Sequence, residues 1–184
     1  TIPVGFAFYE PDPAKKAWNL EDNRLKKQGI AKKNRPPEPP KNPQYPTKQA
    51  LALKLLRDFG TFFPEIHVAC ILADALYSDK DFMHSATTVF GKDTQVISQL
   101  RSNQIIRDKG HEKSVKTYFT SYLGVRKTIS IRGGKIQAVM LGGARLWVKS
   151  HQKKRFVIAL RYEGEQEDRY IVATDTTWRM TDIA

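Results

Sequence analysis

Three apolar residues recur at four-residue spacing in the first third of the chain: Leu51, Leu55 and Phe59. This spacing places them on one side of a helix. Thr47 precedes the pattern, and its hydroxyl is suited to accept a hydrogen bond from an unpaired backbone N–H at a helix start. The pattern predicts an amphipathic helix over residues 48–60.

A continuous apolar run occupies residues 66–73 and is interrupted only by His67. Its length and its lack of polar alternation predict a strand covered on both faces. Ser78 is expected to cap a helix over residues 79–90, and residues 95–100 again have the pattern of a strand. This succession favours two parallel strands joined by a crossover helix.

After residue 127 the pattern changes to short apolar runs separated by turns. The pairs Gly133-Gly134 and Gly142-Gly143 lie between apolar runs, which is typical of hairpin turns. We therefore expect a five-stranded antiparallel meander, with strands over residues 127–132, 135–141, 144–150, 155–162 and 169–174.

The N-terminal region combines a short apolar segment with many prolines. Residues 4–9 have the composition of a strand. Eight of the ten prolines fall within residues 11–46, which predicts a long extended arm. A short helix is possible over residues 14–27, whereas the consecutive prolines in residues 35–41 exclude one.

Composition limits the functional classes. The formal net charge is +12 and the isoelectric point is near 9.8, so a polyanion is an expected partner. No apolar run approaches the roughly 20 residues that span a bilayer. The first residues lack the pattern of a signal peptide, and the single Cys70 cannot form an internal disulfide, so we expect a reducing, cytoplasmic setting. The four histidines are scattered and are interpreted as structural residues.

The positive charge is concentrated in residues 101–155, which hold 14 basic and 2 acidic side chains. Such an excess favours contact with nucleic-acid phosphates over a merely solvated face. Trp147 is a candidate for stacking on an unpaired base, with packing on a neighbouring element as the alternative. The candidate DNA-binding residues are Arg101, Arg126, Lys127, Arg132, Lys135, Trp147, Lys149, Lys153, Lys154 and Arg155, with Arg107, Lys113 and Lys116 as further basic candidates.

Asp74 is the sharpest candidate for chemistry, because it follows a predicted buried strand, and ligands collect at the carboxyl ends of strands in open α/β sheets. The alternative is that this carboxylate only caps the following turn. The chain has no nucleophile elbow, phosphate-binding loop or dinucleotide fingerprint, so other common enzyme classes are disfavoured.

Several separated segments resemble the DDE transposases of bacterial insertion sequences. They are Ile-Leu-Ala-Asp-Ala-Leu-Tyr-Ser at residues 71–78, Gln-Val-Ile-Ser-Gln-Leu-Arg-Ser-Asn-Gln at 95–104 and Phe-Val-Ile-Ala-Leu-Arg-Tyr-Glu-Gly-Glu at 156–165, followed by 168–175. Residues 3–9 and 43–47 also resemble that family. The segments occur in the family's order over nearly the whole chain.

The resemblance implies an α/β fold with a partial RNase H-like (retroviral-integrase-like) core and an antiparallel β-meander insertion. Residues 1–104 would form the core portion, and residues 105–184 the basic insertion and the return toward the core. Three carboxylates of that family hold two Mg²⁺ (or Mn²⁺) ions, and Asp74 matches the second of them. The first Asp and the final Glu would lie outside this sequence, so we expect the chain to be inactive alone.

The resemblance further implies transposon ends and target DNA as partners, a homodimer on DNA and association with the bacterial nucleoid. Two other functions stay open. One is a non-catalytic nucleic-acid-binding module or remnant of a mobile element. The other is a metal-dependent nuclease of the same fold without strand transfer.

Overall fold

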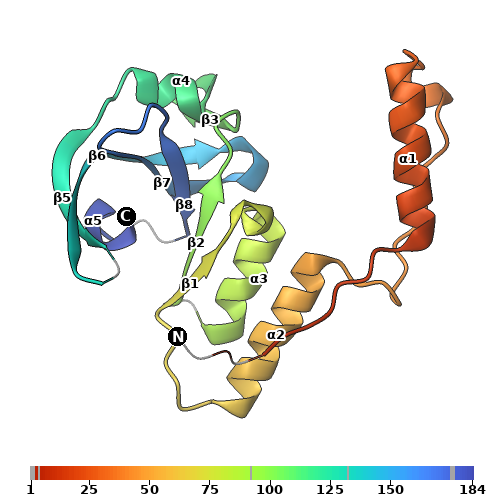
Figure 1. Ribbon diagram of the computed structural model, residues 1–184, viewed down its shortest axis with the longest axis horizontal. Helices are drawn as coiled ribbons and strands as arrows, with labels where there is room; N and C mark the ends of the chain where they lie inside the picture. Colours follow the sequence, from red (N-terminus) through yellow and green to blue (C-terminus); the bar gives the residue numbers. More distant parts are fainter. Residues whose placement is uncertain (1–2, 4, 92, 132, 175–176) are drawn as a thin grey trace. The chain divides into compact units, whose positions relative to one another are not determined.

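The computed structural model describes residues 3, 5–91, 93–131, 133–174 and 177–184 (Figure 1). The described chain is mixed α/β with a mostly antiparallel sheet. It forms two compact units, Thr1–Phe62 and Phe63–Ala184. The predicted division at residue 104 falls inside the second unit, between its second and third strands. Among the described residues no helix combines the length and apolar character needed to cross a bilayer.

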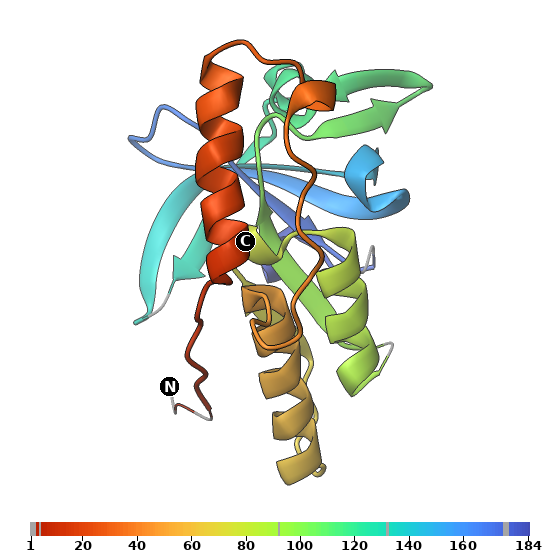
Figure 2. The ribbon, with the colours of Figure 1, turned by 90° about the vertical axis from the view of Figure 1, so that its right-hand side faces the viewer.

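The first unit contains α1 (Pro13–Lys27), the short 3₁₀ helix η1 (Lys32–Asn34) and α2 (Lys48–Phe62). Asp12 caps α1 by accepting bonds from the first backbone N–H groups, and Pro13 suits the first turn. The proline-rich segment then returns beside α1 (Figure 2), where the Trp18 indole donates to the Pro36 carbonyl at 2.9 Å. The short helix and the non-helical 35–41 segment are confirmed.

Two predictions for this unit differ from the structure. Val4 lies outside the described residues, and residues 5–10 form no strand; Gly5 instead lies against the Leu55 side chain of α2. The predicted helix over 48–60 is confirmed, with Thr47 Oγ1 accepting from Ala50 N at 3.1 Å, but it continues past Gly60 to Phe62.

The second unit is built on one eight-stranded sheet. Its strands are β1 (Cys70–Ala73), β2 (Gln95–Leu100), β3 (Ile105–Asp108), β4 (His111–Ser114), β5 (Val125–Ile131), β6 (Lys135–Val148), β7 (Lys153–Tyr162) and β8 (Arg169–Ala173). The strand order is β1-β2-β8-β7-β6-β3-β4, and β5 pairs with β6 off this path. The helices of the unit are η2 (Ala75–Tyr77), α3 (Lys80–Phe90), α4 (Val115–Thr120), η3 (Lys149–His151) and α5 (Met180–Ile183).

The predicted β-α-β succession is present, since β1 runs parallel to β2 and α3 connects them. The prediction that the first strand is covered on both faces is wrong. Only residues 70–73 of this run are strand, they pair with no described strand other than β2, and Leu72 is 76% exposed. Asp79, not Ser78, caps α3 by accepting bonds from Asp81 N and Phe82 N. Ser78 instead donates to the Ala75 carbonyl.

The predicted meander of five strands is present as four, β5 to β8. Gly133-Gly134 is a turn, but Gly142-Gly143 lies inside β6 and pairs with Ala159 and Ile158 of β7. These two glycines leave room for close contacts instead of reversing the chain. A Cβ on Gly142 would lie 3.3 Å from the Gly124 Cα, and a Cβ on Gly143 would lie 2.6 Å from the Met180 sulfur.

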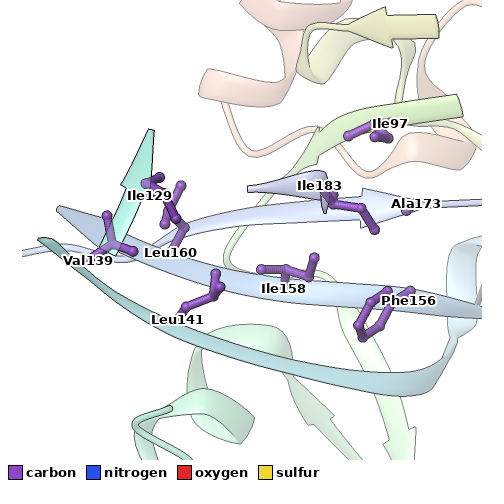
Figure 3. Close-up of a cluster of buried hydrophobic side chains, with 9 residues drawn as sticks. All are labelled: Ile97, Ile129, Val139, Leu141, Phe156, Ile158, Leu160, Ala173 and Ile183. Atoms are coloured by element: carbon purple, nitrogen blue, oxygen red, sulfur yellow. The ribbon is translucent and has the colours of Figure 1, made fainter. Parts of the chain in front are cut away.

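The sheet has an apolar cluster on one face (Figure 3). Alternate residues of β7, namely Phe156, Ile158 and Leu160, contribute to it, as the period of a strand requires. Ile183 of α5 also belongs to the cluster, and Trp178 packs against it. Phe82, Met83 and Ala86 of α3 are buried but belong to no part of this cluster, and α3 packs against β2 from the opposite face. α5 therefore covers the cluster face near the centre of the sheet, and α3 covers the other face near β2.

Candidate metal site and nucleic-acid interface

Asp74 lies directly after the carboxyl end of β1, on the exposed surface. One carboxylate oxygen accepts a bond from Leu76 N at 2.7 Å, so the side chain caps η2. The Asp74 carbonyl accepts from the Ser98 hydroxyl of β2 at 2.6 Å, which fixes this turn to the parallel neighbour. The capping interpretation is confirmed, and it occupies one of the two carboxylate oxygens.

Metal binding by Asp74 needs other ligands. Among the described residues there is no group of three or more His, Cys, Asp or Glu side chains that could hold a metal ion. A carboxylate oxygen suits Mg²⁺, but the ion is held by several oxygen ligands, including waters. Asp74 fits the role of one ligand, and the described chain does not bring a complete ligand set to it.

The run Lys153, Lys154, Arg155 does not form one basic surface. The predicted strand begins at residue 155, but all three residues are in β7, where successive side chains point to opposite faces. The turn is formed by η3 and Gln152, which has the left-handed φ of 49°. Lys153 and Arg155 therefore share one face of the sheet, and Lys154 lies on the other.

Arg155 is a candidate DNA contact, but it does not lie on the exposed surface. Its side chain is buried, and its Nε donates to Nδ1 of His151 at 3.2 Å. Burial lowers the pKa of the Arg155 guanidinium. His151 is also buried, and its pKa is lowered to about 4, first by burial and then by the charge of Arg155. No local sequence pattern indicates this contact, because it depends on how η3 folds back on β7.

Three candidate DNA-binding residues lie opposite one another on three neighbouring strands. Trp147 of β6 pairs with Arg107 of β3 on one side and with Lys154 of β7 on the other. Paired residues point to the same face, so an indole lies between two cationic side chains. Trp147 is half-buried, whereas Leu146 and Val148 beside it are buried on the opposite face. We name these three residues the Trp147 row.

The other basic candidates are dispersed over the unit. Arg126 and Lys127 lie on β5, Lys135 begins β6, and Arg101 follows β2, all of them exposed. Arg132 lies outside the described residues. Several candidates are already paired: Arg126 contacts Glu163 and Lys149 contacts Glu112, each at 2.6 Å, and Arg107 also contacts Glu112 at 3.4 Å. Lys113 forms a longer pair with Asp108 at 3.4 Å, and Lys116 is exposed on α4.

Comparisons with known proteins return no match to this chain, whether with family models, with curated proteins or with solved structures.

Proposed function

We propose that this chain is the central portion of the catalytic domain of a DDE transposase with an RNase H-like core. The observation that carries the proposal is the position of Asp74 at the carboxyl end of β1, in the one parallel strand pair of the described sheet. Ligand sites in open α/β sheets lie at this end of the strands. The segments that resemble the family support the same function.

Two features of the sheet support an incomplete core. β1 pairs with β2 only, so its other edge has unpaired backbone groups among the described strands, and the exposed Leu72 lies on it. An open edge of this kind is suited to pair with another strand. On the far side of β2 the sheet continues through the antiparallel strands β8, β7 and β6. This strand order is expected for a core in which further strands pair with β1 and an antiparallel insertion extends the sheet from β2.

In the proposed enzyme Asp74 is one of three carboxylates that hold Mg²⁺ or Mn²⁺, and the other two come from outside the described residues. Two such ions would stabilise the attacking and leaving oxygens during phosphodiester hydrolysis and strand transfer. The contribution of this chain is to hold the Asp74 backbone through Ser98 and to orient the carboxylate through Leu76 N. The proposed partners are transposon ends and target DNA, bound by a homodimer.

The decisive experiment replaces Asp74 by Asn in the full-length protein and measures Mg²⁺-dependent cleavage and joining of DNA. Asn keeps an oxygen that can cap η2 but removes the charge, so folding and DNA affinity should be unchanged while cleavage falls by about a thousandfold or more. Asp79→Asn is the matched control, because Asp79 caps α3 in the same way. Retained cleavage in Asp74→Asn, or equal loss in both variants, would overturn the proposal.

A nucleic-acid-binding module without chemistry is the second candidate, and the Trp147 row favours it. The Trp147 indole offers a base-stacking face, Lys154 beside it offers a phosphate contact, and Arg107 on the other side is shared with Glu112 at 3.4 Å. Trp147→Leu should lower affinity for single-stranded DNA about tenfold or more, since stacking contributes roughly 1–3 kcal/mol per base. Lys154→Gln should lower the salt dependence of binding by about one phosphate contact. Unchanged binding in both variants would exclude the row as a DNA contact.

Detection of joined target DNA, and not only nicks, separates a transposase from a nuclease.

A further inference from the structure

An open cavity of about 570 Å³ lies between α3 and the face of the sheet that carries Lys153 and Arg155. Its size is within the range of ligand pockets, roughly 300–1,000 Å³. It is separate from Asp74 and from the Trp147 row, since none of those residues lines it. The lining residues are His84, Thr87, Thr88, Gly91, Thr94, Lys153, Arg155 and Thr174.

The periods of a helix and of a strand bring this lining together. His84, Thr87 and Thr88 follow the i, i+3, i+4 spacing of one face of α3. Lys153 and Arg155 are two residues apart in β7 and so share a face. The cavity is therefore built by regular elements of the second unit and not by a single loop.

The charge of Arg155 is not balanced by a carboxylate in the described chain. The residue is 4% exposed, the only hydrogen bond of its side chain to a described residue goes to the neutral ring of His151, and it forms no ion pair with a described residue. Arg35, the other sheltered arginine, pairs with Asp22 at 2.8 Å. A buried cation without a partner is strongly unfavourable. None of the described residues that line the cavity is acidic, so the missing counter-charge fits a ligand.

The available donors around the cavity are cationic. All four lining threonines already donate their hydroxyl protons within the chain: Thr87 to Met83 O, Thr88 to His84 O, Thr94 to Val68 O and Thr174 to Gln95 Oε1. Thr174 Oγ1 already accepts from Val96 N at 2.8 Å, and the hydroxyl oxygens of the other three can still accept. Arg155 and Lys153 supply the N–H donors, and the exposed His84 lies at the helix side. This combination suits an oxyanion that accepts several bonds and can carry a proton of its own.

We infer that this cavity binds a phosphate group. A phosphate offers oxygens to the guanidinium and the ammonium, and such charge-assisted bonds are strong. Near neutral pH a phosphate monoester is also partly protonated, so it can donate to a threonine oxygen. The inference does not depend on Asp74 or on transposase activity.

The test is calorimetric titration of the chain with inorganic phosphate, against chloride at equal ionic strength. Lys153→Gln should weaken phosphate binding about tenfold or more, the effect of losing one charge-assisted hydrogen bond. Lys109→Gln is the matched control, because it removes the same charge from an exposed residue in the turn between β3 and β4, which does not line the cavity. Arg155→Gln should abolish binding, with circular dichroism to check folding. No phosphate-specific heat, or equal weakening in Lys153→Gln and Lys109→Gln, would overturn the inference.

A competition experiment identifies the source of the phosphate. If a short duplex displaces inorganic phosphate, and displacement is lost in Lys153→Gln, the site takes a phosphate of DNA. If phosphate binds but no duplex displaces it, the site takes free phosphate or a phosphorylated small molecule. Both results support a phosphate site. Failure of the proposed function is distinguishable, because Asp74→Asn should leave phosphate binding unchanged.

Discussion

The units Thr1–Phe62 and Phe63–Ala184 are ordered by different kinds of contact. In the first, no described residue is buried, and α1 is held to the returning chain by polar contacts: Asp22 with Arg35, the Trp18 indole with Pro36, and Lys15 with Glu38. In the second, an apolar core lies on both faces of a sheet. A proline-rich, highly charged segment has too little apolar surface for a core, so directional contacts replace it.

Truncating a buried side chain distinguishes most clearly between the apolar contacts of the second unit and the polar contacts of the first. Ile158→Ala should lower the free energy of unfolding of the second unit by about 3–4 kcal/mol, because Ile158 is fully buried in the cluster and the cavity left behind adds to the lost burial. Urea unfolding measures the loss. Ile136→Ala, at a site that is 70% exposed, should change it by less than about 1 kcal/mol. Amide exchange in α1 should be the same in both variants.

The second unit also contains a buried polar contact, between His151 and Arg155, and this makes it sensitive to acid. The pKa of His151 in the folded protein is about 4, below its ordinary value of 6.5. The unfolded chain therefore takes up the proton first as pH falls. The contribution of His151 to the free energy of unfolding should be constant above about pH 7. It should decrease between pH 6.5 and 4, by up to about 3 kcal/mol.

Thermal unfolding across this pH range tests the effect of His151. In His151→Gln the amide can still accept from Arg155 but does not titrate, so this part of the pH dependence should disappear. An unchanged pH profile in the variant would assign the acid sensitivity to other groups.

Backbone contacts can be tested at Gly124, which has a φ of 74° and packs against β6. A Cβ there would lie 2.5 Å from the Leu141 carbonyl oxygen, and this backbone cannot move aside easily. Gly124→Ala should destabilise the unit by about 2–3 kcal/mol. Gly110→Ala is the control, because Gly110 has a similar φ of 85° but open space around it. It should lose only about 1 kcal/mol, measured by the same urea unfolding. Equal losses of stability in the two variants would mean that the positive φ, and not the close contact with Leu141, causes the destabilisation.

The smallest expected effect concerns the polar contacts of the first unit. Asp22→Asn leaves the sheltered Arg35 without its ion pair, which should lower the opening free energy of α1 by about 1–2 kcal/mol. Amide exchange in α1 measures this change, and the melting of the second unit should not change. Asp58→Asn, which breaks the exposed i, i+4 pair with Lys54, should have an effect below about 0.5 kcal/mol. If Asp22→Asn is equally mild, the first unit is held mainly by its apolar contacts.

Features set by local pattern could be predicted from the sequence. Four-residue apolar spacing located α2, the apolar run followed by Asp74 located β1 and its carboxyl end, and the prolines located the arm. The parallel pairing of β1 and β2 followed from the helix between them. These features depend on residues close together in the chain.

Features set by contacts between distant residues could not be predicted. A Gly-Gly pair is typical of a turn, but Gly142-Gly143 is in a strand because Gly124 and Met180 approach it closely. The hairpin of β3 and β4 lies in a polar stretch with no apolar alternation. Arg155 looked like a surface cation because its neighbours are lysines, and its burial depends on His151 folding back from η3.

The long strand β6 has a consequence for the order in which the sheet folds. Its residues 135–141 pair with β5 and residues 139–148 with β7, and both hairpins close over short loops. By contrast, β2 finds β8 only after a closure between residues such as Ile97 and Ala173. Local pairings form with less loss of chain entropy, so β5, β6 and β7 should assemble first and the β1–β2 edge last. The turn that holds Asp74 would then be the part of the sheet that orders latest and reopens most often.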